Sequence, residues 1–146
     1  MSTQNKALVR RWINAAYNKG DWKVLDDLLA STYVRHDQAS GITGKGPDVE
    51  KQVGALYRTA FPDLHIKIDE MVAEGNTVAV RWTAIGRNTG KLGDIPPSGR
   101  KVVTPGISIC RISRGKITEH FANWDTAAFN QQVTGQSEQA VAASAR

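Results

Sequence analysis

Apolar residues in the first sixty positions recur every three to four residues, which is the spacing of amphipathic helices. Three such stripes lie at residues 3–17, 22–29 and 47–60. Asp21 stands at the N-cap position of the second stripe, and Pro47 stands at the first helical position of the third, where proline is tolerated. The pattern therefore predicts three helices in the first half of the chain.

From residue 64 onward apolar and polar residues alternate, as they do in half-buried strands. We expect four strands here, at residues 64–73, 78–85, 102–113 and 116–123. Residues 86–100 carry four Gly and two Pro and predict a long loop, and Asp125 is placed to cap a short terminal helix. Because each layer must bury its apolar face, the order predicts an α+β cone, in which a strongly bent antiparallel sheet encloses a pocket against the helices.

The composition fits one domain. A chain of 146 residues with 40% hydrophobic residues can bury its own core, and we place the domain at residues 1–134 with a tail at 135–146. The single cysteine, Cys110, excludes an internal disulfide. Neither a signal peptide nor an apolar run of about 20 residues is evident. We therefore expect a cytoplasmic protein that does not enter a membrane.

The charge does not indicate a nucleic-acid partner. The 19 Lys and Arg residues exceed the 14 Asp and Glu residues, giving a formal charge of +5, but basic residues are scattered and no known nucleic-acid module accompanies them. The three histidines lie far apart and match no metal-binding spacing, so we expect no metal ion.

Several short segments resemble the SnoaL-like polyketide cyclases, or ester cyclases, of the nuclear transport factor 2-like superfamily. They are Phe61-Pro62-Asp63-Leu64, residues 74–82 (EGNTVAVRW), residues 95–100 (IPPSGR), and Arg111 before residues 115–120 (GKITEH). The resemblance covers residues 6–134. It implies the nuclear transport factor 2-like cone, no cofactor, a hydrophobic small-molecule substrate and a homodimer. It also implies acid/base chemistry, such as the aldol-type cyclisation of a polyketide-like carbonyl compound.

The resemblance implies candidate catalytic residues. Asp125 matches the family's catalytic carboxylate, which acts as a general acid/base, although capping alone would explain an Asp at this position. His36 matches a position where the family often carries a pocket-facing His or Asp, and a surface histidine is the alternative. His120 is a weaker candidate, because strand alternation places it with Ala122 and Trp124, on the opposite face from Asp125.

Aromatic residues are the candidates for binding an apolar substrate. The residues we expect to bind substrate are Tyr33, Tyr57, Trp82, Phe121 and Trp124. The chain departs from the family in carrying Arg87-Asn88 where many members have Thr-His, and in lacking a histidine at residues 106–111.

Two alternatives to a cyclase remain open. One is an epoxide hydrolase or isomerase in the same pocket, for which Arg81 and Asp125 are candidates. The other is a non-catalytic small-molecule-binding or dimerisation module in which Asp125 is only a cap.

Overall fold

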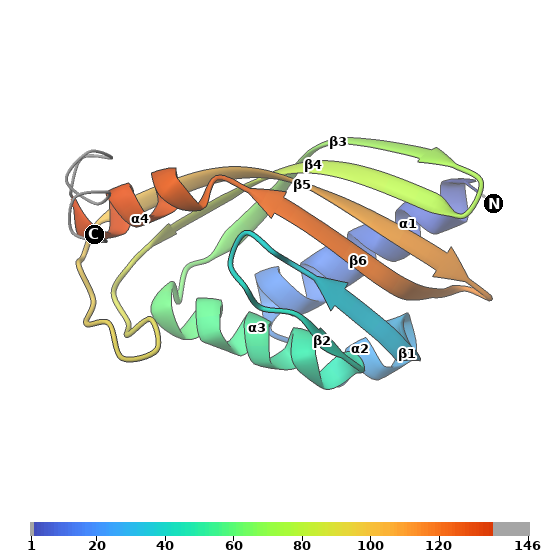
Figure 1. The fold of residues 1–146 in the computed structure, drawn as a ribbon, viewed down its shortest axis with the longest axis horizontal. Helices are drawn as coiled ribbons and strands as arrows, with labels where there is room; N and C mark the ends of the chain where they lie inside the picture. The colour runs from blue at the N-terminus through green and yellow to red at the C-terminus, as the bar shows by residue number, and fades with distance from the viewer. Residues whose placement is uncertain (1, 136–146) are drawn as a thin grey trace.

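A computed structural model describes residues 2–135 of the chain (Figure 1). Its helices are α1 (Ser2–Ile13), the π-helical turn η1 (Asn14–Lys19), α2 (Leu25–Leu28), α3 (Pro47–Ala60) and α4 (Thr126–Thr134). Its strands are β1 (Leu29–His36), β2 (Gly44–Lys45), β3 (His65–Glu74), β4 (Thr77–Arg87), β5 (Lys101–Ser113) and β6 (Lys116–Trp124).

The six strands form one sheet in the order β2-β1-β6-β5-β4-β3. All neighbours are antiparallel except β1 and β6, which run parallel, so the sheet is mixed rather than wholly antiparallel as expected. The parallel pair is possible because α3 and four further strands separate β1 from β6 along the chain. Parallel strands need such a long connection, whereas a tight turn suffices for an antiparallel pair.

The helices cover one face of the sheet. Figure 1 shows α1 and α3 on the same side of the bent strands, and both helices pack against strands. Along β5 buried and exposed residues alternate strictly from Lys101 to Ser113, so one face of this strand looks toward the helices and the other looks away. The core and the pocket lie between the helices and that inner face.

Two local features differ from the expected helices. The first helix continues through a π-helical turn to Lys19 and ends at Gly20, whose φ of +66° is the left-handed conformation that glycine adopts easily. The second helix is shorter than predicted, because residues 23–24 form a turn and Leu29 already belongs to β1. The N-cap residue of α2 is therefore Val24, and the expected cap at Asp21 is wrong. Residues 136–146, which hold nearly all of the predicted tail, lie outside the described residues. Among residues 2–135, no helix is both long enough and apolar enough to cross a membrane.

Candidate functional site

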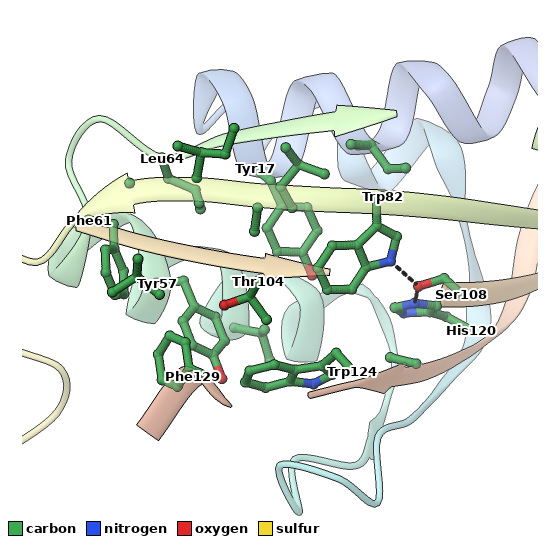
Figure 2. A pocket seen from close by; sticks show the side chains of 18 of the residues that line it. Tyr17, Tyr57, Phe61, Leu64, Trp82, Thr104, Ser108, His120, Trp124 and Phe129 are labelled. Atoms are coloured by element: carbon green, nitrogen blue, oxygen red, sulfur yellow. Dashed lines mark hydrogen bonds between the residues drawn. The ribbon is translucent and has the colours of Figure 1, made fainter. Parts of the chain in front are cut away.

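An apolar cavity of about 100 Å³ lies between the helices and the inner face of the sheet. Figure 2 shows aromatic rings along its walls and a short chain of polar side chains at one end. The aromatic residues that line the cavity are Trp12, Tyr17, Tyr57, Phe61, Trp82, Trp124 and Phe129. A concave, mostly apolar cavity with a few convergent polar groups is typical of a small-molecule site.

Buried ionic groups lie behind the polar end of the cavity. Arg35 stands between two carboxylates, with Nη1 2.7 Å from Glu50 Oε1 and Nη2 2.8 Å from Asp37 Oδ2. Both carboxylates are also buried, and Arg35 itself lines the cavity. Tyr17 and Tyr33 donate to Glu50 at 2.7 and 2.5 Å. We call these five residues the Arg35 network.

Glu50 is held ionised by the Arg35 network. Burial opposes ionisation of this carboxyl, but the Arg35 guanidinium and hydrogen bonds from His120 and Tyr33 outweigh burial and hold its pKa below the usual range. Each carboxylate oxygen already has protein partners: Oε1 accepts from Tyr33 and Arg35, and Oε2 accepts from Tyr17. Glu50 therefore orders neighbouring side chains rather than facing a ligand.

A second chain of hydrogen bonds connects Glu50 to the cavity, and Figure 2 shows its part from Trp82 through Ser108 to His120. Trp82 Nε1 lies 3.0 Å from Ser108 Oγ, which lies 2.8 Å from His120 Nε2, and His120 Nδ1 lies 3.3 Å from Glu50 Oε1. An indole N–H can only donate, so Ser108 accepts from Trp82 and has its own hydrogen to give to Nε2. An ionised Glu50 can only accept, and we assign the imidazole hydrogen to Nδ1 on this ground, because Arg35 Nη1, which lies 3.4 Å from Nδ1, donates to Glu50 at the shorter distance of 2.7 Å. We call this the His120 chain.

We infer that His120 is a neutral imidazole and that its Nε2 lone pair accepts from Ser108. Burial lowers its pKa, although Glu50 beside it acts in the opposite direction. The side chain reaches the cavity because it lies on the inner face of β6, as strand alternation indicated. A neutral imidazole backed by a carboxylate can take up a proton, since the carboxylate stabilises the imidazolium that results.

Gly106 gives the Trp82 indole its position. The two residues are directly paired across β4 and β5, and any side-chain carbon at residue 106 would collide with the Trp82 ring. Glycine inside a strand often marks such a close approach. The indole therefore lies over the β5 backbone, from where Nε1 reaches Ser108.

Neither Asp125 nor His36 is among the residues that line the cavity. Asp125 is exposed and caps α4, with Oδ1 accepting from Ala128 N at 2.9 Å. His36 stacks on Phe121, with ring centroids 4.4 Å apart, and its Nε2 lies 3.0 Å from Glu119 Oε2.

The remaining predicted residues divide into those that line the cavity and those that do not. Tyr57, Trp82 and Trp124 line the cavity, whereas Tyr33 is buried against Glu50 and outside the lining. Phe121 lies beneath His36, away from the cavity. Arg81, a candidate in the epoxide hydrolase scheme, is also absent from the lining and lies near surface carboxylates.

The sequence contained a signal for the Arg35 network that the residue-by-residue analysis missed. Glu50 lies three residues before Val53 and seven before Tyr57, so it shares the apolar stripe of α3. A carboxylate on such a stripe predicts a buried partner, because isolated charges are costly to bury. Arg35 lies two residues after Tyr33 on β1, so both side chains are on the same buried face, and Arg35 is the cation that pairs with Glu50. Within residues 2–135, no three His, Cys, Asp or Glu side chains are grouped closely enough to hold a metal ion.

Comparisons with known proteins agree with this architecture. A SnoaL-like protein from Jannaschia sp. CCS1 has a TM-score of 0.84 at 21% identity, covering 94% of this chain and 96% of its own. IdmH from Streptomyces antibioticus has a TM-score of 0.79 at 24% identity, covering 90% and 99%. A Catenulispora acidiphila protein with a ketosteroid isomerase-like fold has a TM-score of 0.73 at 17% identity, covering 90% and 95%. No match was found among curated proteins.

These likenesses show the nuclear transport factor 2-like fold that the sequence predicted. The family is shown separately, because the model of the SnoaL-like polyketide cyclases matches residues 7–133, which is most of the chain. The chain thus belongs to the family of SnoaL-like polyketide cyclases.

Proposed function

We propose that the protein is a cofactor-independent enzyme that transfers protons to and from a hydrophobic carbonyl compound, as in an aldol-type cyclisation, with His120 as the general base. The observation that carries the proposal is the position of His120 at the polar end of an apolar cavity, held between Ser108 and Glu50. Burial lowers the pKa of this imidazole, which favours the unprotonated form that can accept a proton.

The groups around His120 suit the charges that develop when a carbon acid loses a proton. Because Ser108 donates to Nε2, the substrate proton passes to Ser108 Oγ as the Ser108 hydroxyl hydrogen moves to Nε2, and the imidazolium that forms is stabilised by Glu50 at Nδ1. The enolate oxygen needs a hydrogen-bond donor. Trp12 lines the cavity beside His120, and its buried indole N–H has no hydrogen-bond partner among the described residues, so it is our candidate donor.

The experiment is a ligand screen with polycyclic and polyketide-like ketones, followed by thermal shift, with turnover measured on every hit. His120→Gln is expected to keep binding and lose turnover, whereas His36→Gln is a matched control that removes an imidazole outside the cavity lining. Asp125→Asn keeps a good helix cap and removes the carboxylate that the family resemblance implied as the base. Because Asp125 lies outside the cavity lining, this variant should keep its turnover. Binding without turnover in the wild type would contradict the proposal, as would full turnover in His120→Gln.

A second candidate reaction is epoxide hydrolysis, in which carboxylates with an arginine between them hold the attacking water. The observation that favours it is Arg35 lying between Asp37 and Glu50. The occupied carboxylate oxygens speak against it, since Asp37 Oδ2 already accepts from Arg35, Ser40 and Trp124. Turnover of a cyclic alkene oxide to a diol carrying oxygen from labelled water would favour this reaction over proton transfer.

We also propose that the protein is a homodimer that pairs through the outer face of its sheet. Large apolar side chains are exposed there on β5, at Val103, Ile107 and Ile109. A folded monomer rarely leaves such a patch uncovered. Light scattering on the wild type should give twice the chain mass, and Ile107→Lys should give the single-chain mass without loss of helix or sheet content.

A further inference from the structure

Thr104 is a buried hydroxyl without a partner. It is 2% exposed, and its Oγ1 accepts and donates no hydrogen bond among the described residues. It also lines the cavity, and Figure 2 shows its hydroxyl turned toward the side where Tyr57 lies. Buried polar groups nearly always find a partner, so an orphan at a ligand cavity indicates a partner that arrives with the ligand.

The other buried orphan among residues 2–135 is Trp12 Nε1. Its indole packs edge-on against His120, with ring centroids 4.7 Å apart, so it belongs to the polar end of the cavity already described. Thr104 is different, because it lies on β5 four residues from Ser108. At about 3.3 Å per residue the two positions are about 13 Å apart along the strand.

Trp82 fills the interval between these two positions. Its indole lies over Gly106, which is midway between Thr104 and Ser108 on the same face of β5. A ligand that reaches both hydroxyls must therefore pass across the indole. Flat apolar ring systems pack well on such a surface.

We propose that Thr104 is a second anchoring residue, and that the ligand carries two hydrogen-bonding oxygens whose spacing matches the distance between Thr104 and Ser108. One oxygen lies at the Ser108–His120 end, where the proposed proton transfer takes place, and the other is bound by the Thr104 hydroxyl. The inference rests on the proposed function only in using the same cavity. It specifies a substrate class by the spacing of two oxygens rather than by the reaction.

The first test needs no ligand. Thr104→Val keeps the shape of the side chain and removes the orphan hydroxyl, so the ligand-free variant should melt several degrees above the wild type. Thr104→Ser keeps the hydroxyl and is the matched control, which should melt at or below the wild-type temperature. A Thr104→Val protein that is no more stable than the wild type would show that the hydroxyl is not an orphan.

The second test measures affinity by calorimetry with ligand pairs that differ in one terminal oxygen: androstanedione against androstanone, and naphthalenediol against naphthol. The wild type should prefer the two-oxygen member of a pair by about tenfold, the size of one hydrogen bond. Thr104→Val should lose this preference and Thr104→Ser should keep it.

Equal affinity within both pairs, or no binding of either pair to the wild type, overturns the inference. Because the readout is binding, a wild type that discriminates within a pair but turns nothing over supports Thr104 as an anchor while contradicting the proposed enzyme. Conversely, if the wild type and Thr104→Val turn over every pair equally well, the proposed enzyme is supported and the anchoring role of Thr104 is contradicted.

Discussion

Replacing Glu50 by Gln is expected to destabilise the protein strongly. The carboxylate is fully buried and has three hydrogen bonds of 2.5 to 2.7 Å, from Tyr17, Tyr33 and Arg35. Gln keeps the volume but removes the charge, which leaves Arg35 with Asp37 as its one ionic partner among the described residues. Breaking a buried ion pair by removing one partner typically costs about 3–5 kcal/mol.

That cost is large against the roughly 5–15 kcal/mol by which a domain of this kind is stable. With a urea m-value of about 2 kcal/mol/M, the unfolding midpoint should fall by about 1.5–2.5 M. Equilibrium unfolding in urea, followed by far-UV circular dichroism, measures this shift.

The matched control for Glu50→Gln is Lys51→Gln, the next residue on the same helix. Lys51 pairs with Asp26 at 2.9 Å, but the Asp26 side chain is 60% exposed. Exposed ion pairs contribute little to stability, so this midpoint should hardly move. A Glu50→Gln midpoint as close to the wild type as that of Lys51→Gln would refute the claim that the Arg35 network stabilises the fold.

The remaining predictions concern a cap, a close contact and pH. Asp125→Ala should lower the free energy of unfolding by about 1 kcal/mol because it removes the cap of α4, whereas Asp125→Asn should leave it nearly unchanged; chemical denaturation compares them. Gly106→Ala should lower the free energy of unfolding by about 1–3 kcal/mol, because the added methyl collides with the Trp82 ring. If its urea unfolding midpoint equals that of the wild type, the close contact is absent. Stability should fall as the pH drops below about 6.5, because the lowered pKa of His120 means that only the unfolded state takes up its proton there. Glu50, whose pKa is also lowered, should add to the loss below about pH 4.3, where the unfolded carboxyl protonates first. Urea unfolding at pH 7, 6 and 5 measures this dependence of stability on pH. His120→Gln should lose less stability between pH 7 and pH 5 than the wild type, and an equal loss in both proteins would contradict a neutral buried imidazole.

Hydrophobic periodicity was enough to predict most of the fold. The alternation at residues 102–113 corresponds to β5, and the stripe at 47–60 corresponds to α3. The parallel pairing of β1 with β6 could not be predicted in this way, because strand periodicity carries no information about neighbours or direction.

The candidate site was harder to predict, because it depends on which side chains converge. Parity along β6 correctly placed His120 on the face that it shares with Ala122 and Trp124, and this is the face that lines the cavity. The contact between His120 and Glu50 joins residues 70 positions apart, and no local pattern specifies such a contact. Gly106 was a usable signal, since glycine within a strand suggests close packing, but its partner Trp82 emerges only from the strand register.

The central claim is that His120 abstracts a proton from a carbon acid bound in the cavity. Exchange of the α-protons of α-tetralone with deuterium in heavy water, followed by proton NMR, tests this step without knowledge of the natural substrate. The wild type and His36→Gln should accelerate exchange over buffer, and His120→Gln should lose the acceleration, since a general base contributes about 10²- to 10⁴-fold. Exchange at the buffer rate in the wild type, or equal exchange by the wild type and His120→Gln, would contradict the account.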